Sequence, residues 1–212
     1  MPIQTRLTEF ARTTVTDASL TPSSRPPYPE TAADRGREAR ARVWFDPDIA
    51  AMLDHIAERR SCDVARYGKQ DKQNHLIGAA GELADATWHG GTFDTRIFDE
   101  FEGDDGVDIE VPQPGDIGPL KVQVKTTRDM ESPERVVERQ VLDVVDHVVL
   151  CCTNAPRKVV EIVGYVPARD LRRRENKYGR DGPAIRPSNI LPVPDEGQEF
   201  YPDDVRQYHT TK

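Results

Sequence analysis

Two alternating segments on either side of a proline- and glycine-rich linker constrain the fold of this chain most. Apolar and polar side chains alternate along residues 107–111 (VDIEV) and 120–127 (LKVQVKTT). Such alternation places the aliphatic side chains on one face of a sheet and the polar ones on the other. The linker 112–119 (PQPGDIGP) holds three prolines and two glycines, which cannot continue a ladder. The sequence therefore predicts a β-hairpin.

The register of this hairpin decides which polar side chains meet. If Val111 lies opposite Leu120, Asp108 falls opposite Gln123, and Lys125 follows two positions later on the same face. Magnesium prefers hard oxygen ligands such as a carboxylate or a carboxamide. An ammonium group beside them can hold an attacking water or neutralise charge on a scissile phosphate. We therefore expect a site for Mg²⁺, which Mn²⁺ can replace.

A helix rich in small residues precedes the hairpin. We expect it to span about residues 71–88 and to carry Glu82 beside Gly78, Ala79 and Gly81, which let another backbone or a substrate approach closely. Its inward residues are Leu76, Ala80, Leu83, Ala84 and Thr87. An earlier helix begins at Pro47 with Asp46 as its N-cap, ends near Arg60, and buries Ile49, Met52, Leu53 and Ile56.

The order of Glu82 on a helix, Asp108 on a strand and Gln123-Val124-Lys125 on the next strand resembles the PD-(D/E)xK nuclease superfamily, above all its prokaryotic and viral branches. The resemblance implies an α/β fold of the restriction-endonuclease type, with a mixed central sheet flanked by helices. It implies that Asp108 and Gln123 bind the metal, with the backbone carbonyl of Val124 in reach. It also implies that Lys125 serves the nucleophile and that Glu82 is an auxiliary ligand or holds a water.

Two positions depart from the usual pattern of that superfamily. Val107 stands where a proline usually precedes the aspartate, and Gln123 stands where a second acid is usual. A carboxamide still coordinates a hard cation but lowers the negative charge of the site. The alternative is therefore a catalytically decayed nuclease-fold module that binds DNA or a sliding clamp. A nuclease acting on RNA and a plain amphipathic hairpin with a solvated polar face also stay open.

The charge distribution bears on DNA binding. The net charge is −8, but seven basic residues lie between positions 169 and 186. We interpret five residues there as a DNA-binding group that contacts phosphates and stacks on a base, namely Arg172, Arg173, Arg174, Lys177 and Tyr178. The alternative is a solvated helix end whose cations complement the helix dipole.

The N-terminal part carries a second binding motif. Residues 1–42 are rich in Thr, Ser and Pro and hold few large apolar residues, which predicts a disordered tail. Within residues 4–11, Gln4, Leu7 and Phe10 resemble a sliding-clamp-binding peptide, although a chance amphipathic stretch explains the spacing equally well. We expect this tail, a nuclease-like domain over residues 43–186, and a C-terminal arm over residues 187–212.

The remaining segments predict strands and exclude several protein classes. We expect strands at 92–98, 147–152 and 159–166, a short helix begun by Pro167, and a charged connection or short helix at 133–140. The three cysteines are odd in number and form no CxxC motif, which indicates a reducing compartment and argues against a zinc site or an iron–sulfur cluster. No apolar run is long enough for a membrane span, and no apolar segment marks a signal peptide. We therefore expect a cytoplasmic protein.

These observations together predict a metal-dependent DNA endonuclease. It would hydrolyse phosphodiester bonds with a magnesium-activated water and act in DNA repair, recombination or restriction. DNA is the expected partner, a sliding clamp is a second, and homodimer formation is left open.

Overall fold

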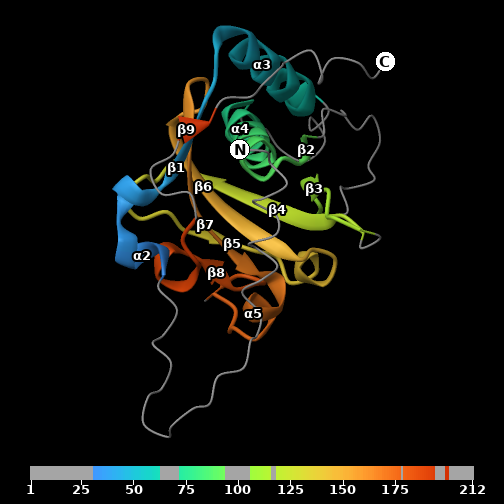
Figure 1. The fold of residues 1–212 in the computed structure, drawn as a ribbon, viewed down its shortest axis with the longest axis vertical. Helices are drawn as coiled ribbons and strands as arrows, with labels where there is room; N and C mark the ends of the chain where they lie inside the picture. The colour runs from blue at the N-terminus through green and yellow to red at the C-terminus, as the bar shows by residue number, and fades with distance from the viewer. Residues whose placement is uncertain are drawn as a thin grey trace, which may run out of the picture.

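The computed structural model describes residues 31–62, 72–93, 106–115, 118–177, 179–193 and 199–200. Its helices are α2 (Ala32–Arg35), η1 (Arg37–Ala39), α3 (Pro47–Cys62), α4 (Lys72–His89), η3 (Val141–Asp143), α5 (Ala168–Arg172) and η4 (Pro187–Asn189). Its strands are β1 (Ala41–Trp44), β2 (Thr92–Phe93), β3 (Ile109–Val111), β4 (Leu120–Thr127), β5 (Arg135–Val136), β6 (His147–Ala155), β7 (Val159–Pro167), β8 (Ala184–Ile185) and β9 (Glu199–Phe200) (Figure 1).

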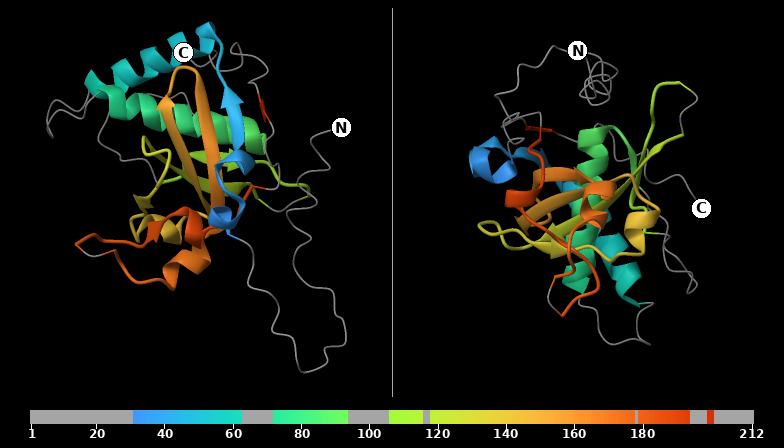
Figure 2. Two further views of the ribbon diagram at one scale, coloured as in Figure 1. Left: turned by 90° about the vertical axis from the view of Figure 1, so that its left-hand side faces the viewer. Right: turned by 90° about the horizontal axis from the view of Figure 1, so that it is seen from below.

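A mixed sheet forms the centre of the fold. Its seven described strands follow the order β2-β3-β4-β6-β7-β1-β9, in which β4 runs parallel to β6 and β1 parallel to β9, while the other neighbours are antiparallel. β5 and β8 pair in a separate small sheet. Figures 1 and 2 show α3 and α4 over one side of the central sheet and α5 with the small sheet toward the other. The expected mixed α/β architecture with flanking helices is confirmed.

Alternation along the central strands divides the core into two parts. Val122 and Val124 of β4, with Val149 of β6, pack with α3 and α4. Val148 and Leu150 of β6 point the other way and pack with α5 and the small sheet. Because neighbouring residues on a strand face opposite sides, Gln123 and Lys125 belong to the second side.

Helix α3 begins where its local sequence predicts. The carboxylate of Asp46 accepts a hydrogen bond from the amide of Ile49 at 2.8 Å, which caps the helix N-terminus. The four expected core residues of this helix are all buried. The helix ends at Cys62, two residues beyond the expected end.

Helix α4 approaches the sheet closely at one glycine. Its expected inward residues are buried, except Thr87, which is half-buried and donates its hydroxyl to the Leu83 carbonyl. A Cβ atom at Gly81 would lie 1.9 Å from the Thr126 hydroxyl oxygen on β4. A side chain at this position would therefore push the helix off the sheet. The small residues around Glu82 thus serve contact between α4 and β4.

The hairpin of β3 and β4 has the register that its alternation predicts. Val111 pairs with Leu120 and Ile109 with Val122, and β4 covers the expected residues 120–127. β3, however, begins at Ile109 rather than at residue 107. The reason lies in the bonds that Asp108 makes, which are described with the site below.

Downstream elements extend or correct the expected ones. β6 and β7 include the two expected strands, and Pro167 is the N-cap residue of α5 rather than part of its first turn. The charged connection or short helix expected at 133–140 is wrong in part, because β5 lies there and pairs with β8. A two-residue strand has no local periodicity, so only its distant partner reveals it. Of the strand expected at 92–98, β2 is described and the rest lies outside the described residues.

Packed residues lie on both sides of the expected domain boundaries. Ala32 is buried, and its amide donates to the carbonyl of Ile190 at 3.0 Å. Leu191 exchanges hydrogen bonds with Tyr165 of β7. The segments around positions 32 and 190 are therefore part of the domain that contains the central sheet. Residues 1–30, with the predicted clamp-binding peptide at 4–11, lie outside the described residues.

Candidate functional site

The predicted site lies where the β3–β4 ladder ends. The backbone amide of Asp108 donates to the Val122 carbonyl at 3.0 Å, and its carboxylate accepts a hydrogen bond from the Val124 amide at 2.6 Å. A side-chain oxygen thus takes the place that a backbone carbonyl would occupy in a continuing ladder. Disrupted ladders of this kind re-aim side chains and recur beside active sites. The bond fixes the Asp108 carboxylate at the backbone of Val124, the residue that follows Gln123.

Gln123 presents an unsatisfied oxygen to this corner. Its side chain is only 5% exposed, and no described residue donates a hydrogen bond to its Oε1 atom. Burying a carbonyl oxygen without a partner is costly, so such an atom calls for an explanation. A bound cation would satisfy it. The carboxamide oxygen is thus suited to a metal ligand.

The backbone of Val124 completes a set of oxygen donors. The amide and carbonyl of one strand residue point the same way, so the Val124 carbonyl faces the side on which its amide meets Asp108. One carboxylate, one carboxamide oxygen and one backbone carbonyl are ligands that Mg²⁺ accepts, with water in its other positions. In the described part of the chain, the candidate site included, no group of three or more His, Cys, Asp or Glu side chains is placed to hold a metal ion. The donor set at Asp108, Gln123 and Val124 therefore fits a hard cation.

Lys125 lies on the same face as Gln123, with a partner that sequence reasoning missed. Its ammonium nitrogen lies 2.9 Å from Oε2 of Glu138, in the segment between β5 and η3. Burial acts to raise the pKa of the Glu138 carboxyl. The hydrogen bond from Lys125, a backbone hydrogen bond and the lysine charge outweigh that effect and hold the pKa below its usual value. Glu138 therefore stays ionised beside the lysine.

Glu82 lies on the other side of the sheet. It belongs to α4, which packs against the face formed by Val122 and Val124. Its carboxylate accepts two hydrogen bonds from the Arg60 guanidinium of α3, at 3.1 and 3.3 Å. Gln123 and Lys125 share one face of β4, and the amide of Val124 between them in the sequence binds the Asp108 carboxylate, whereas Glu82 belongs to the helix that covers the other face. The expectation that Glu82 reaches that face is corrected, and its auxiliary role stays a prediction.

Most of the predicted DNA-binding group is bonded to the protein itself. Arg172 donates from Nε to the Leu142 carbonyl at 2.7 Å, and Arg174 donates to the Asn189 carbonyl at 2.8 Å. Lys177 forms an ion pair with Glu134. Arg173 is exposed, and its side chain has no hydrogen bond or ion pair to any described residue, although its backbone amide donates to the Leu171 carbonyl. Tyr178 lies outside the described residues.

Arg139 binds the segment that runs from the end of α5 to Asn176. Arg139 donates to the carbonyls of Arg172 and Arg174, at 3.0 and 2.6 Å, and to the side chain of Asn176 at 2.6 Å. Its guanidinium thereby satisfies the carbonyls that follow α5. No local pattern in the sequence connects Arg139 to a segment more than thirty residues away.

A second polar cluster lies under α4. Asp85 is fully buried, and its Oδ1 atom lies 2.8 Å from Nδ1 of His89, one turn further along the helix. His147 of β6 stacks near Tyr165, with ring centroids 5.9 Å apart. Burial, and then the charge of His89, lower the pKa of His147. The spacing of Asp85 and His89 was visible in the sequence, but their burial was not.

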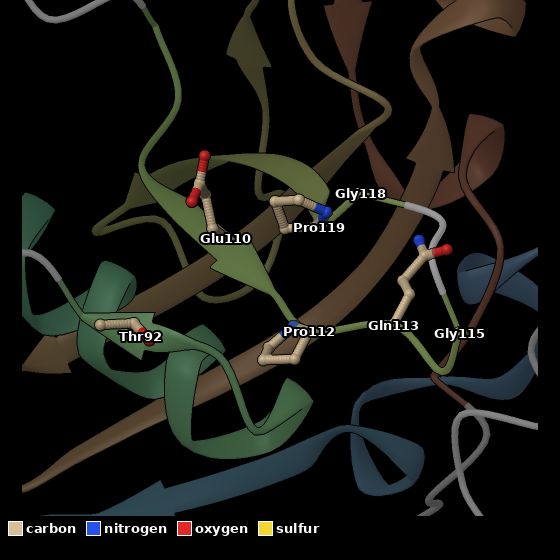
Figure 3. A pocket seen from close by; sticks show the side chains of 7 residues that line it. All are labelled: Thr92, Glu110, Pro112, Gln113, Gly115, Gly118 and Pro119. Carbon is tan, nitrogen blue, oxygen red and sulfur yellow. The ribbon is translucent and has the colours of Figure 1, made fainter.

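A hollow at the tip of the hairpin is separate from the candidate site. About 430 Å³ in volume, it is lined by Thr92, Glu110, Pro112, Gln113, Gly115, Gly118 and Pro119. Figure 3 shows these residues around the turn, with Glu110 as the one acid among them. The turn joins the end of β3 to the start of β4, whereas Asp108 precedes β3. Among its described lining residues, the hollow has no cation for a phosphate and no second acid for a metal.

Comparison with known proteins adds no relative. No protein-family model, no curated protein and no solved structure matches this chain. Among the described residues, no helix is both long and apolar enough to cross a membrane. The candidate site is therefore judged by its own geometry.

Proposed function

We propose that this protein is a magnesium-dependent DNA endonuclease with a restriction-endonuclease-like core. One observation carries the proposal: the buried Gln123 oxygen lacks a hydrogen-bond donor among the described residues, and the next residue, Val124, binds the Asp108 carboxylate through its amide. A phosphodiester-hydrolysing site needs hard oxygen ligands beside a cationic group, and Lys125 supplies the cation two residues from Gln123.

Each residue has a distinct part in the proposed reaction. A bound divalent ion supplies a nucleophilic water at neutral pH and withdraws charge from the phosphate. Asp108 and Gln123 would hold that ion, and the Val124 carbonyl would add a neutral ligand. Lys125 orients the water or neutralises charge that develops on the phosphate oxygens. Burial of Gln123 and Val124 keeps bulk water away from one side of the site.

The order of elements supports the proposed fold. Helix α4 is followed by β2, β3 and β4 as successive antiparallel neighbours, and β4 then lies parallel to β6. The helix, the strand that directly follows Asp108 and the strand with the QxK triplet come in the order that the superfamily resemblance implies. The curved mixed sheet holds these last two strands side by side.

Contacts to DNA are part of the same proposal. Arg173 is the cation of its group that can reach a phosphate without giving up another bond among the described residues. Arg172, Arg174 and Lys177 would have to exchange their present partners. Docking of Gln4, Leu7 and Phe10 on a sliding clamp, and homodimer formation, stay predictions.

A second candidate is a nuclease-fold module that has lost catalysis. The carboxamide at Gln123 and the engagement of Glu82 by Arg60, away from the candidate site, favour it. Such a module would bind DNA or a clamp and would neither bind Mg²⁺ tightly nor cleave. Calorimetric titration of Mg²⁺ into the protein separates the two candidates before any substrate is known.

A cleavage assay tests the proposal directly. Linear duplex, flap, splayed-arm and four-way-junction DNA, with one RNA duplex, are incubated with Mg²⁺, Mn²⁺ or a chelator. We expect cleavage by the wild type with metal, and loss of both metal binding and cleavage in Asp108→Ala. Glu110→Ala is the matched control, because it removes an exposed acid two residues after Asp108 that has no assigned part in the site. Cleavage that persists in chelator or in Asp108→Ala would refute the proposal.

A further inference from the structure

The ammonium group of Lys125 identifies a second acid at the candidate site. Glu138 lies thirteen positions after Lys125, outside the motif that carries the superfamily resemblance. Its carboxylate is 2.9 Å from the lysine nitrogen. The Lys125 side chain is half-buried, with 22% of it exposed. The ion pair places a carboxylate on the face of β4 that also presents Gln123.

Hydrogen bonds and one close backbone contact hold the segment that carries Glu138 in place. The amide of Val137 donates to the Pro183 carbonyl at 3.0 Å, and the amide of Val141 donates to the Glu138 carbonyl at 3.1 Å. Gly182 contacts the same segment so closely that a Cβ atom there would lie 1.8 Å from the Val137 oxygen. The backbone around Glu138 is therefore held from two sides.

The other end of this segment reaches the residues that precede Asp108. A Cβ atom at Gly106, which has a φ of +80°, would lie 3.0 Å from the side chain of Val141. Val107 packs in the same apolar cluster as Val137 and Leu142. The turn that starts at Glu138 thus contacts the strand entry that positions Asp108. The segments that carry the two acids are therefore packed together through Gly106, Val107 and Val141.

The net charge of the candidate site indicates what Glu138 contributes. Asp108 carries one negative charge, Gln123 carries none, and Lys125 carries one positive charge, so these three side chains alone are neutral. A neutral site holds a divalent cation poorly, because metal affinity depends on the charge of the ligands. A carboxylate at Glu138 restores one net negative charge. It also keeps the ammonium of Lys125 directed along one face of the sheet.

We propose that Glu138 is the charge-compensating and positioning residue of the site, which supplies from the β5–η3 segment the acid that Gln123 does not. The proposal rests on the proposed magnesium-dependent activity. Glu138 acts through Lys125 and through the field at the metal position, so we count it as a positioning residue. A carboxylate moved to position 123 should therefore substitute for one removed at position 138.

Four variants of the full chain test this role. Glu138→Gln removes the charge, and Glu138→Asp shortens the side chain but keeps the charge. The double variant Gln123→Glu/Glu138→Gln relocates the charge. Glu131→Gln is the matched control, because it makes the same substitution in an exposed residue that pairs with Arg37 instead. Each variant is measured by calorimetric titration of Mg²⁺, by DNA cleavage rate and by thermal melting.

The expected pattern separates a charge role from a structural one. Glu138→Gln should weaken Mg²⁺ affinity and cleavage by roughly 10- to 100-fold, in the range of other residues that orient metal sites. Glu138→Asp should recover part of the loss, and the relocated variant should recover affinity to within a few-fold of wild type. Glu131→Gln should match the wild type.

Two results would overturn the inference, and they differ from failure of the proposed function. If the wild type neither binds Mg²⁺ nor cleaves DNA, the proposed function fails and the role of Glu138 fails with it. If the wild type does both and Glu138→Gln is indistinguishable from it, only the Glu138 role is refuted. A loss in Glu138→Gln that the relocated charge does not restore refutes the charge-compensating role as well and assigns Glu138 to folding.

Discussion

Gly81 offers a sharp test of how α4 is seated on the sheet. A methyl group at this position would lie 1.9 Å from the Thr126 hydroxyl oxygen, 3.0 Å from its Cβ and 3.2 Å from its Cγ2 atom. Rotation of the threonine about χ1 does not remove the clash, because the Cβ atom of Thr126 stays 3.0 Å from the added methyl group. Gly81→Ala must therefore move the helix or deform β4.

The magnitude follows from two opposing terms. Overpacking a filled core costs about 1–3 kcal/mol. Alanine gains about 0.5–1 kcal/mol over glycine inside a helix, because the unfolded chain loses less conformational freedom. We expect a net loss of about 1–2 kcal/mol, which lowers the melting temperature by roughly 2–8 °C in a chain of this size.

Gly78 supplies the matched control on the same helix. Its nearest neighbour to an added Cβ is Oε1 of Glu82 at 3.8 Å, an ordinary contact. Gly78→Ala should therefore stabilise the protein by about 0.5–1 kcal/mol. Urea unfolding followed by circular dichroism measures both variants. A Gly81→Ala protein that is as stable as Gly78→Ala would refute the close approach between α4 and β4.

Three further predictions concern the site and its surroundings. Lys125→Ala should lower the cleavage rate by roughly two to four powers of ten while Mg²⁺ and DNA binding persist, and an unchanged rate would remove Lys125 from the mechanism. Arg173→Ala should lower the slope of log affinity for duplex DNA against log salt by roughly 0.9. Arg172→Ala should instead lower the melting temperature, because its guanidinium binds the Leu142 carbonyl at 2.7 Å; an equal effect of the two changes on DNA binding would contradict this division. Burial raises the pKa of the Glu161 carboxyl, but the bonds and charges of Arg37 and Arg40 outweigh it and hold the pKa below its usual 4.5. The ionised carboxylate therefore stabilises the fold above that pH, and the contribution is lost as the pH falls through the lower folded value. Glu161→Gln should flatten the loss of unfolding free energy between about pH 5 and pH 3, and an equally steep loss in the variant would refute the assignment.

Local sequence determined the hairpin and the start of α3. Alternation over residues 107–111 and 120–127 predicted a hairpin, and the supposed pairing of Val111 with Leu120 is the one the structure has. The alternation does not hold at Val107, which packs in the other cluster from Ile109 and Val111. The Asp46–Pro47 pair predicted the capped N-terminus of α3 in the same way. Both features depend on side chains within a few positions of each other. Their free energy is therefore decided by neighbours along the chain.

Only the tertiary structure decided which charged side chains meet. Glu82 turned out to pair with Arg60 on the α3–α4 side, although its helical position was predicted well. Lys125 turned out to pair with Glu138. Residues 135–136 form the strand β5 because they pair with β8. The hydrophobic periodicity of a helix does not show which side of a sheet the helix will cover.

The basic run after β7 shows the same limit. Seven cations between positions 169 and 186 indicated an exposed phosphate-binding surface. Arg172 and Arg174 instead satisfy the carbonyls of Leu142 and Asn189, which come from other segments. A buried or half-buried carbonyl gains a charge-assisted bond from whichever cation the fold brings near. Sequence determined that cations gather here, and packing decided which of them stay available for a ligand, because partner choice depends on contacts between segments distant in the chain.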